Sequence, residues 1–199
     1  MALTPYVSEE RIDDRAIGEI VDAAGGKQWF AGQYMVRHHL RVAEVAAKHR
    51  IAIDAHEPVK DTGLRRTWPN MVSREGARGQ EFNAWGVPTN PPEHLTILPF
   101  TRMLAGPMDF TPGALNNANK ESWRWNVGQP MSQGTRCHQL AMYVIYESPL
   151  QMLCDSPTRY RREPECMKFL SAVPVVWVGL PASHSAMGFE RDVVVAFVE

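Results

Sequence analysis

The feature that most constrains the fold of this chain is an amphipathic stretch that runs directly into a short apolar segment. Over residues 33–50, apolar side chains recur at helical spacing and form one stripe, made of Val36, Leu40, Ala43 and Ala47. Residues 51–54 follow without a linker and read as a short buried strand. A helix that leads straight into a buried strand is typical of α/β folds, so the sequence predicts that architecture.

Composition and charge exclude several classes of protein. The 199 residues are 44% hydrophobic and 22% charged, with a formal net charge of −1. This balance is that of an ordinary globular protein and provides no overall field that would attract nucleic acid or an anionic membrane. No apolar run approaches the ~18 residues of a membrane span, and the first residues lack the apolar core of a secretory signal. We therefore expect neither a nucleic-acid nor a membrane partner.

The three cysteines give no sign of a disulfide framework or a zinc site. Cys137, Cys154 and Cys166 include no C-x-x-C pair, and their number is odd. Cys137 and Cys154 lie in apolar stretches, so the sequence predicts that both are buried.

Prolines, glycines and periodicity predict the remaining elements. Strands are expected at residues 16–21, 81–85, 106–110, 173–178 and 192–198. Helices are expected at residues 71–79, with Asn70 as the N-cap, and at 95–104, 135–145 and 164–172. Loops are expected at residues 58–69, 87–92 and 116–133.

Carboxylates gather near the ends of predicted strands. Glu57 follows the first buried strand together with His56, and Glu75 and Glu81 come next among arginines, glycines and aromatics. Strand ends hold side chains rigidly toward a ligand, so three carboxylates there indicate an acid–base or hard-metal site. The aromatic neighbours point to a hydroxyl-rich ligand such as a sugar. The alternative interpretation is that these glutamates are solvated surface residues.

Four segments in a fixed order carry the most specific signal of the chain. They read HEPVKDTGLRRTWPN, SREGARGQEFNAW, PPEHLTILPFTRMLAGPMDFTPG and SPLQMLCDSP. Together they resemble glycoside hydrolase family 97, which includes α-glucosidases and related α-galactosidases, and the resemblance covers residues 33–155.

The resemblance implies a fold as well as a chemistry. The expected architecture is α/β, a partial (β/α)₈ TIM-type barrel comprising its C-terminal half, followed by the beginning of a small β-rich module. Residues 1–172 would be the barrel portion and residues 173–199 the start of the C-terminal β domain. Because a whole barrel typically needs ~250 residues, we expect a truncated form whose exposed barrel edges allow self-association.

The resemblance also assigns roles to the carboxylates. Glu81 matches the general acid, which would protonate the departing glycosidic oxygen, with Phe82 and Trp85 as an apolar surround. Glu57 matches a calcium ligand that helps to activate the hydrolytic water in inverting members, and Glu75 matches a second calcium ligand. Glu81 would contact the same Ca²⁺ ion, which takes 6–8 oxygen ligands. A further family ligand comes from an N-terminal domain, so the expected calcium site is incomplete.

Other matched residues receive supporting roles. His56 matches a substrate-contacting position, with a satisfied core histidine as the alternative. The sequence leaves open whether Arg65 and Arg66 position Glu75 or a sugar, or only form ion pairs within the loop. His94 and Arg102 look structural, and Asp109 is expected to give polar support. Gly18 stands near the place of the nucleophile of retaining members, as in inverting members, and Asp22 stays open as an alternative nucleophile.

The leading hypothesis is a calcium-dependent, inverting glycoside hydrolase that cleaves α-glucosidic or α-galactosidic bonds in an oligosaccharide or α-glycoside. The alternative is a truncated, non-catalytic member that keeps only the fold and weak carbohydrate binding. A metal-dependent hydrolase unrelated to sugars would rest on the carboxylates alone, and the histidines lack the H-E-x-x-H spacing of zinc enzymes. The resemblance implies a periplasmic or secreted location, although no signal peptide is seen.

Overall fold

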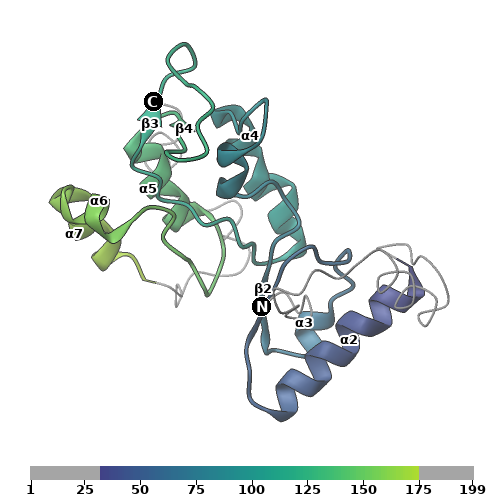
Figure 1. Ribbon diagram of the computed structural model, residues 1–199. Helices are drawn as coiled ribbons and strands as arrows, with labels where there is room; N and C mark the ends of the chain where they lie inside the picture. The colour runs from purple at the N-terminus through teal and green to yellow at the C-terminus, as the bar shows by residue number, and fades with distance from the viewer. Residues whose placement is uncertain (1–31, 175–199) are drawn as a thin grey trace, which may run out of the picture. The chain divides into compact units, whose positions relative to one another are not determined.

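The computed structural model describes residues 32–174 of the chain (Figure 1). The chain divides into two compact units, Met1–Gly76 and Ala77–Glu199. The strands predicted at residues 16–21 and 192–198, and most of the one at 173–178, lie outside the described residues. Within residues 32–174, no helix is both long and apolar enough to cross a membrane.

The first unit alternates helices with two short parallel strands. Its elements are α2 (Gln33–Lys48), β1 (Ile53–Ala55), α3 (Leu64–Thr67) and β2 (Met71–Arg74). β1 and β2 pair in parallel, with Ile53 opposite Met71 and Ala55 opposite Arg74. The helix predicted over residues 33–50 and the strand predicted after it are confirmed, and the loop predicted at 58–69 contains the single turn of α3.

One residue of the predicted apolar stripe of α2, Ala43, packs against the strands. Ala43 is fully buried and packs in one cluster with Ile53, Ala55 and Met71. Four half-buried side chains pack against this cluster: Val42, Ala46, Leu64 and Trp68. The removal of this apolar surface from water is the main force that holds α2 on the strand pair.

β2 occupies residues for which the sequence predicts a helix, so that prediction is wrong. Asn70, the expected N-cap, instead donates from Nδ2 to the backbone oxygens of Ala43 at 3.1 Å and Ile51 at 3.3 Å. These hydrogen bonds tie β2 to α2 and to the segment before β1. Pairing with β1 therefore overrides the local helix signal, because strand formation depends on neighbours more than on propensity.

The second unit is mainly helical. Its elements are η1 (Gln80–Ala84), α4 (Pro92–Ile97), η2 (Leu98–Phe100), η3 (Arg102–Ala105), β3 (Asn117–Ala118), β4 (Ser132–Gln133), α5 (Arg136–Ile145), α6 (Pro157–Arg161) and α7 (Pro164–Ala172). β3 and β4 pair in parallel, with Asn117 opposite Ser132. The predicted helices at 135–145 and 164–172 are confirmed as α5 and α7.

A single apolar cluster forms the core of the second unit. Its buried members are Leu95, Leu98, Met103, Met108, Phe110, Met142 and Tyr146. The rings of Phe110 and Tyr146 meet edge to face with their centroids 5.2 Å apart. The Tyr146 hydroxyl donates to the Leu95 oxygen at 2.8 Å, so this ring is buried without an unsatisfied polar group.

Several local predictions for the second unit are corrected by the structure. The strand expected at 81–85 is the 3₁₀ helix η1, and the helix expected at 95–104 is divided near Pro99 into α4, η2 and η3. The strand expected at 106–110 is reduced to one bridging residue, Met108. The loop expected at 116–133 carries β3 and β4 at its two ends. Cys137 and Cys154 are exposed, contrary to the prediction.

The strands of residues 32–174 form two separate parallel pairs, β1–β2 and β3–β4. Helices mixed with parallel strands agree with the predicted α/β class. The half barrel itself stays a prediction.

Candidate active site

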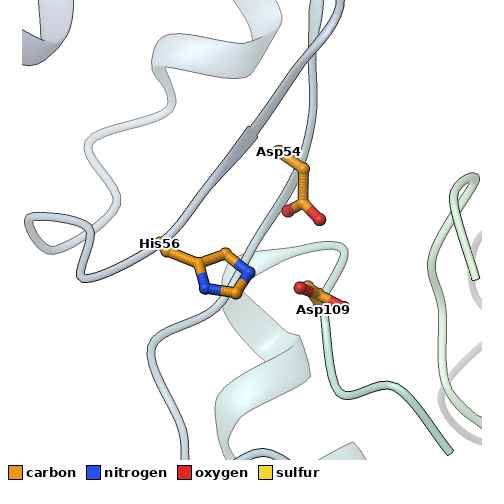
Figure 2. A group of neighbouring side chains, drawn as sticks. All are labelled: Asp54, His56 and Asp109. Carbon is orange, nitrogen blue, oxygen red and sulfur yellow. The ribbon is translucent and has the colours of Figure 1, made fainter. Parts of the chain in front are cut away.

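The site predicted from the sequence begins at the carboxyl end of β1. Asp54 lies on this strand and is buried, His56 is half-buried and Glu57 is exposed. Figure 2 shows the side chains of Asp54 and His56 at this end of the strand. Glu57 has a φ of 49°, a left-handed conformation that residues other than glycine seldom adopt. Backbone strain of this kind is frequent at functional positions.

The parallel pairing of β1 and β2 brings Glu75 beside Glu57. Glu75 follows β2, and its N–H donates to the Ala55 oxygen at 2.9 Å, which continues the ladder. The Glu57 N–H in turn donates to Glu75 Oε2 at 3.2 Å. Because neighbouring parallel strands end at the same sheet edge, two predicted site residues distant in sequence lie next to each other there.

His56 belongs to the same group. Its Nδ1 lies 4.0 Å from Glu75 Oε2, and 37% of its side chain is exposed. This exposure does not fit a satisfied core histidine. The ring can therefore offer a hydrogen bond to a polar ligand while it stays close to the Glu75 carboxylate.

Residues that the sequence analysis gave no role hold the loop after Glu57. Asp61 Oδ1 accepts from the Gly63 N–H at 2.8 Å, and Asp61 Oδ2 lies 3.6 Å from both Arg74 Nη2 and Arg65 Nε. Arg74 also donates from Nη1 to the Val59 oxygen at 3.1 Å. Burial lowers the pKa of the Arg74 guanidinium, and the Asp61 carboxylate opposes that shift. Arg65 is thus an ion-pair partner within the loop, one of its two predicted roles. The Asp61-Thr62-Gly63 turn was the available sequence signal.

Glu81 lies in the second unit, on η1, with its side chain exposed. Phe82 is half-buried, and the Arg78 guanidinium lies over its ring at 5.0 Å from the centroid. Trp85, the second aromatic expected around Glu81, is 56% exposed. Within the described part of the second unit, Phe82 is therefore better placed than Trp85 to provide a fixed apolar neighbour.

Buried amides, which no sequence motif marked, lie beneath the 3₁₀ helix that carries Glu81. Gln80 and Asn83 are 3% and 2% exposed, and both side chains donate to Ser132 Oγ. Gln80 also donates to Gln139, which is fully buried on α5. The signal was weak, because amides at these positions read as ordinary polar surface.

The segment that follows η3 holds a further predicted polar residue. Asp109, labelled in Figure 2, is 4% exposed and accepts from the Thr111 hydroxyl at 3.3 Å. Arg102 donates to the oxygens of Gly106 at 3.1 Å and Pro107 at 3.3 Å. The expected structural role of Arg102 is thus visible as support for the turn that precedes Asp109.

Comparisons with known proteins assign these residues to a family. The family model for glycoside hydrolase 97 matches residues 4–77. A retaining α-galactosidase of Bacteroides thetaiotaomicron is 44% identical over 146 residues, which are 73% of this chain and 22% of that protein. A probable retaining α-galactosidase of Streptomyces bingchenggensis is 32% identical over 145 residues, 73% of this chain and 20% of that protein.

Solved structures of family 97 enzymes also match this chain. A glycoside hydrolase family 97 enzyme from Pseudoalteromonas sp. strain K8, in complex with panose or with acarbose, is 51% identical with a TM-score of 0.67. The chain belongs to glycoside hydrolase family 97. The match covers 20–22% of the lengths of the curated relatives and of the solved enzyme, so the chain spans about a fifth of each. The match to the solved enzyme covers 75% of this chain.

Membership of family 97 confirms the resemblance found in the sequence. The segment matched by the family model contains α2, β1 and β2 and therefore the neighbouring residues Glu57 and Glu75. Both curated relatives are named retaining enzymes, whereas the sequence predicts inversion.

Proposed function

We propose that this family 97 protein hydrolyses α-glycosidic bonds in oligosaccharides or α-glycosides, with Glu81 as the general acid. One observation carries the proposal: the β1–β2 pairing joins Glu57 and Glu75 at one strand edge in a family 97 chain. Glycoside hydrolysis requires a proton donor at the leaving oxygen and a second carboxylate that acts on the other face of the sugar. The relatives named α-galactosidases and the enzyme bound to panose or acarbose support the substrate class.

The roles of the side chains follow from their chemistry. Glu81, exposed on η1, donates its proton to the departing glycosidic oxygen. His56 donates a hydrogen bond to a sugar hydroxyl. In an inverting reaction Glu57 accepts the proton of the attacking water, whereas retention would require a carboxylate nucleophile elsewhere in the protein.

Calcium, which the family resemblance implies, fits the residues at the end of the strand pair. Ca²⁺ prefers carboxylate oxygens in flexible sites, and the Glu75 carboxylate lies at the backbone of Glu57, whose exposed side chain carries a second carboxylate. These two residues would hold the ion. Contact of Glu81, in the second unit, with the same ion stays a prediction. When bound, calcium supplies positive charge for sugar hydroxyls and for nearby carboxylates.

The finer fold prediction is part of the same proposal. The order α2, β1, α3, β2 with parallel pairing is the connection pattern of a (β/α)₈ barrel, so we assign residues 1–172 to the C-terminal half of a barrel. Residues 173–199 would begin the β-rich module. Self-association through barrel edges and a periplasmic or secreted location stay predictions, and size-exclusion chromatography measures the first.

The test is hydrolysis of methyl α-galactoside and methyl α-glucoside by the purified 199-residue chain and by its Glu81→Gln variant, because their alkoxide leaving groups depend on a proton from the general acid. Loss of the proton donor should lower kcat by roughly 10²–10⁴-fold. Glu93→Gln is the matched control, because Glu93 is also an exposed glutamate near the start of a short helix in the second unit. Its turnover should equal that of the unchanged chain.

Each outcome bears on a different part of the proposal. Equal turnover by Glu81→Gln and the parent chain would refute the role of Glu81. No turnover by a folded chain that still binds an α-glycoside would support the alternative, a non-catalytic carbohydrate-binding member. The anomer released first, followed by proton NMR, separates inversion from retention.

A further inference from the structure

Glu81 is carried by a helix that is too short to fix its own orientation. η1 has five residues, and Gly79 at its N-cap position provides no side-chain hydrogen bond. Short 3₁₀ segments have poor hydrogen-bond geometry and depend on their surroundings for stability. The direction of the Glu81 carboxyl is therefore determined by what holds the neighbouring residues of η1.

Gln80, the residue before Glu81, is held on three sides. Its backbone N–H donates to the Phe110 oxygen at 2.9 Å. Its side-chain Nε2 donates to Ser132 Oγ at 2.5 Å and to Gln139 Oε1 at 2.9 Å. With only 3% of Gln80 exposed, water cannot replace these partners easily, so its position depends on them.

Gln139 is the centre of this arrangement. It is fully buried on α5, and its Oε1 also accepts from the N–H groups of Gly113 and Ala114, both at 3.1 Å. These two backbone donors dictate which end of the amide faces inward, because a reversed amide would place a donor against them. The same oxygen faces Gln80, so Gln80 must turn its donor atom Nε2 toward it.

The cost of this geometry is visible in the same two side chains. Gln139 Nε2 and Gln80 Oε1 are buried and have no hydrogen-bond partner within the described residues. Each unsatisfied buried polar atom is expensive. The amide at position 139 leaves two such atoms, but its oxygen satisfies the N–H groups of Gly113 and Ala114 and the side chain of Gln80. Local costs of this kind are expected where a protein maintains a functional geometry.

The other end of η1 is anchored by a second set of polar contacts. Asn83 donates from Nδ2 to Ser132 Oγ at 3.2 Å, and its Oδ1 accepts from the Asn90 N–H at 3.1 Å and from the Thr89 hydroxyl. A loss of the Gln139 contact therefore acts on the Gln80 end of η1, because the contacts of Asn83 do not involve Gln139.

We propose that Gln139 is a positioning residue for Glu81: its amide oxygen holds Gln80 and so aims the carboxyl of the adjacent Glu81. The inference rests on the proposed role of Glu81 as general acid. A general acid acts only within hydrogen-bond reach of the leaving oxygen, and a displacement of about 1 Å can lower the rate roughly 10²-fold.

The kinetic test uses the dependence of hydrolysis on the leaving group. Methyl α-glycosides need a proton on the departing oxygen, whereas α-glycosyl fluorides need far less help from the acid. For Gln139→Met, which removes the accepting oxygen, kcat/KM for the methyl α-glycoside should fall by roughly 10²-fold and that for the fluoride by less than about threefold. A purely structural role lowers both in proportion, and that result would overturn the proposal.

Two variants of α5 provide the controls. Gln139→Glu keeps an accepting oxygen at the same distance along the side chain. The ratio of its kcat/KM values for the methyl α-glycoside and the fluoride should therefore equal that of the parent chain. Tyr146→Phe, at the C-terminal end of α5, removes a buried hydrogen bond to Leu95 that does not involve η1. It should change the two substrates equally.

Backbone hydrogen exchange in the full chain tests the coupling without any turnover. In Gln139→Met the amides of residues 80–86 should exchange several-fold faster relative to those of α7, and in Tyr146→Phe they should not. Unchanged exchange in Gln139→Met refutes the inference. Failure of this inference can be told apart from failure of the proposed function. If Glu81→Gln loses activity equally on the methyl α-glycoside and the fluoride, the acid role of Glu81 is refuted, but the exchange result for Gln139 still stands.

Discussion

Replacement of Gly113 by alanine should destabilise the second unit, for two reasons that the structure separates. Gly113 has a φ of 94°, which costs a residue with a Cβ about 1–2 kcal/mol. An added Cβ would also lie 2.6 Å from the Tyr143 hydroxyl and 3.0 Å from the Tyr160 hydroxyl. Forced overpacking of this kind typically costs about 1–3 kcal/mol.

The two hydroxyls cannot move aside without further loss. The Tyr143 hydroxyl lies 2.6 Å from the Pro112 oxygen and 2.9 Å from the Met152 oxygen, and the Tyr160 hydroxyl donates to the Gly113 oxygen at 2.9 Å. We therefore expect both costs to appear, a total of about 2–5 kcal/mol, reduced by about 0.4–1 kcal/mol because alanine restricts the unfolded chain.

Gly134→Ala in the same unit is the matched control. Gly134 also has a positive φ, 101°, but the nearest atom to an added Cβ is His138 Nδ1 at 3.1 Å. Backbone strain and the unfolded-state effect are then common to both variants, and their difference, up to about 3 kcal/mol, measures the additional packing cost at Gly113. Urea unfolding of the two variants and the parent chain provides the free energies. If Gly113→Ala lost no more stability than Gly134→Ala, the close packing of the tyrosines around Gly113 would be refuted.

Two further predictions concern pH and metal. Burial lowers the pKa of His138 below its ordinary value of 6.5, so below about pH 6.5 the unfolded chain binds a proton that the folded chain does not. Stability should therefore fall as the pH drops through that window, and His138→Gln should weaken this dependence in urea unfolding between pH 7 and 5; an unaltered pH profile would contradict the role of His138. Calorimetric titration with Ca²⁺ should show binding that EDTA reverses and that Glu75→Gln weakens by at least roughly tenfold. Equal affinity in Glu75→Gln and in Glu44→Gln, a control on α2, would exclude Glu75 as a ligand.

The sequence predicted those parts of the fold that depend on local periodicity. The helices predicted at residues 33–50, 135–145 and 164–172 are each encoded within a few turns of chain, and the structure confirms them as α2, α5 and α7. Order and spacing of motifs were enough to identify family 97. The choice of Glu57, Glu75 and Glu81 as site residues came from the same motifs.

Tertiary structure decided what local patterns could not. Residues 71–74 became a strand because β1 offered a parallel partner, and that pairing brought Glu75 to Glu57. Residues 80–84 form a 3₁₀ helix in which Gln80 is held by buried polar groups from distant segments, Ser132 and Gln139. Sequence patterns record which side chains avoid water, whereas strand pairing and buried hydrogen bonds depend on partners that arrive only when the chain folds.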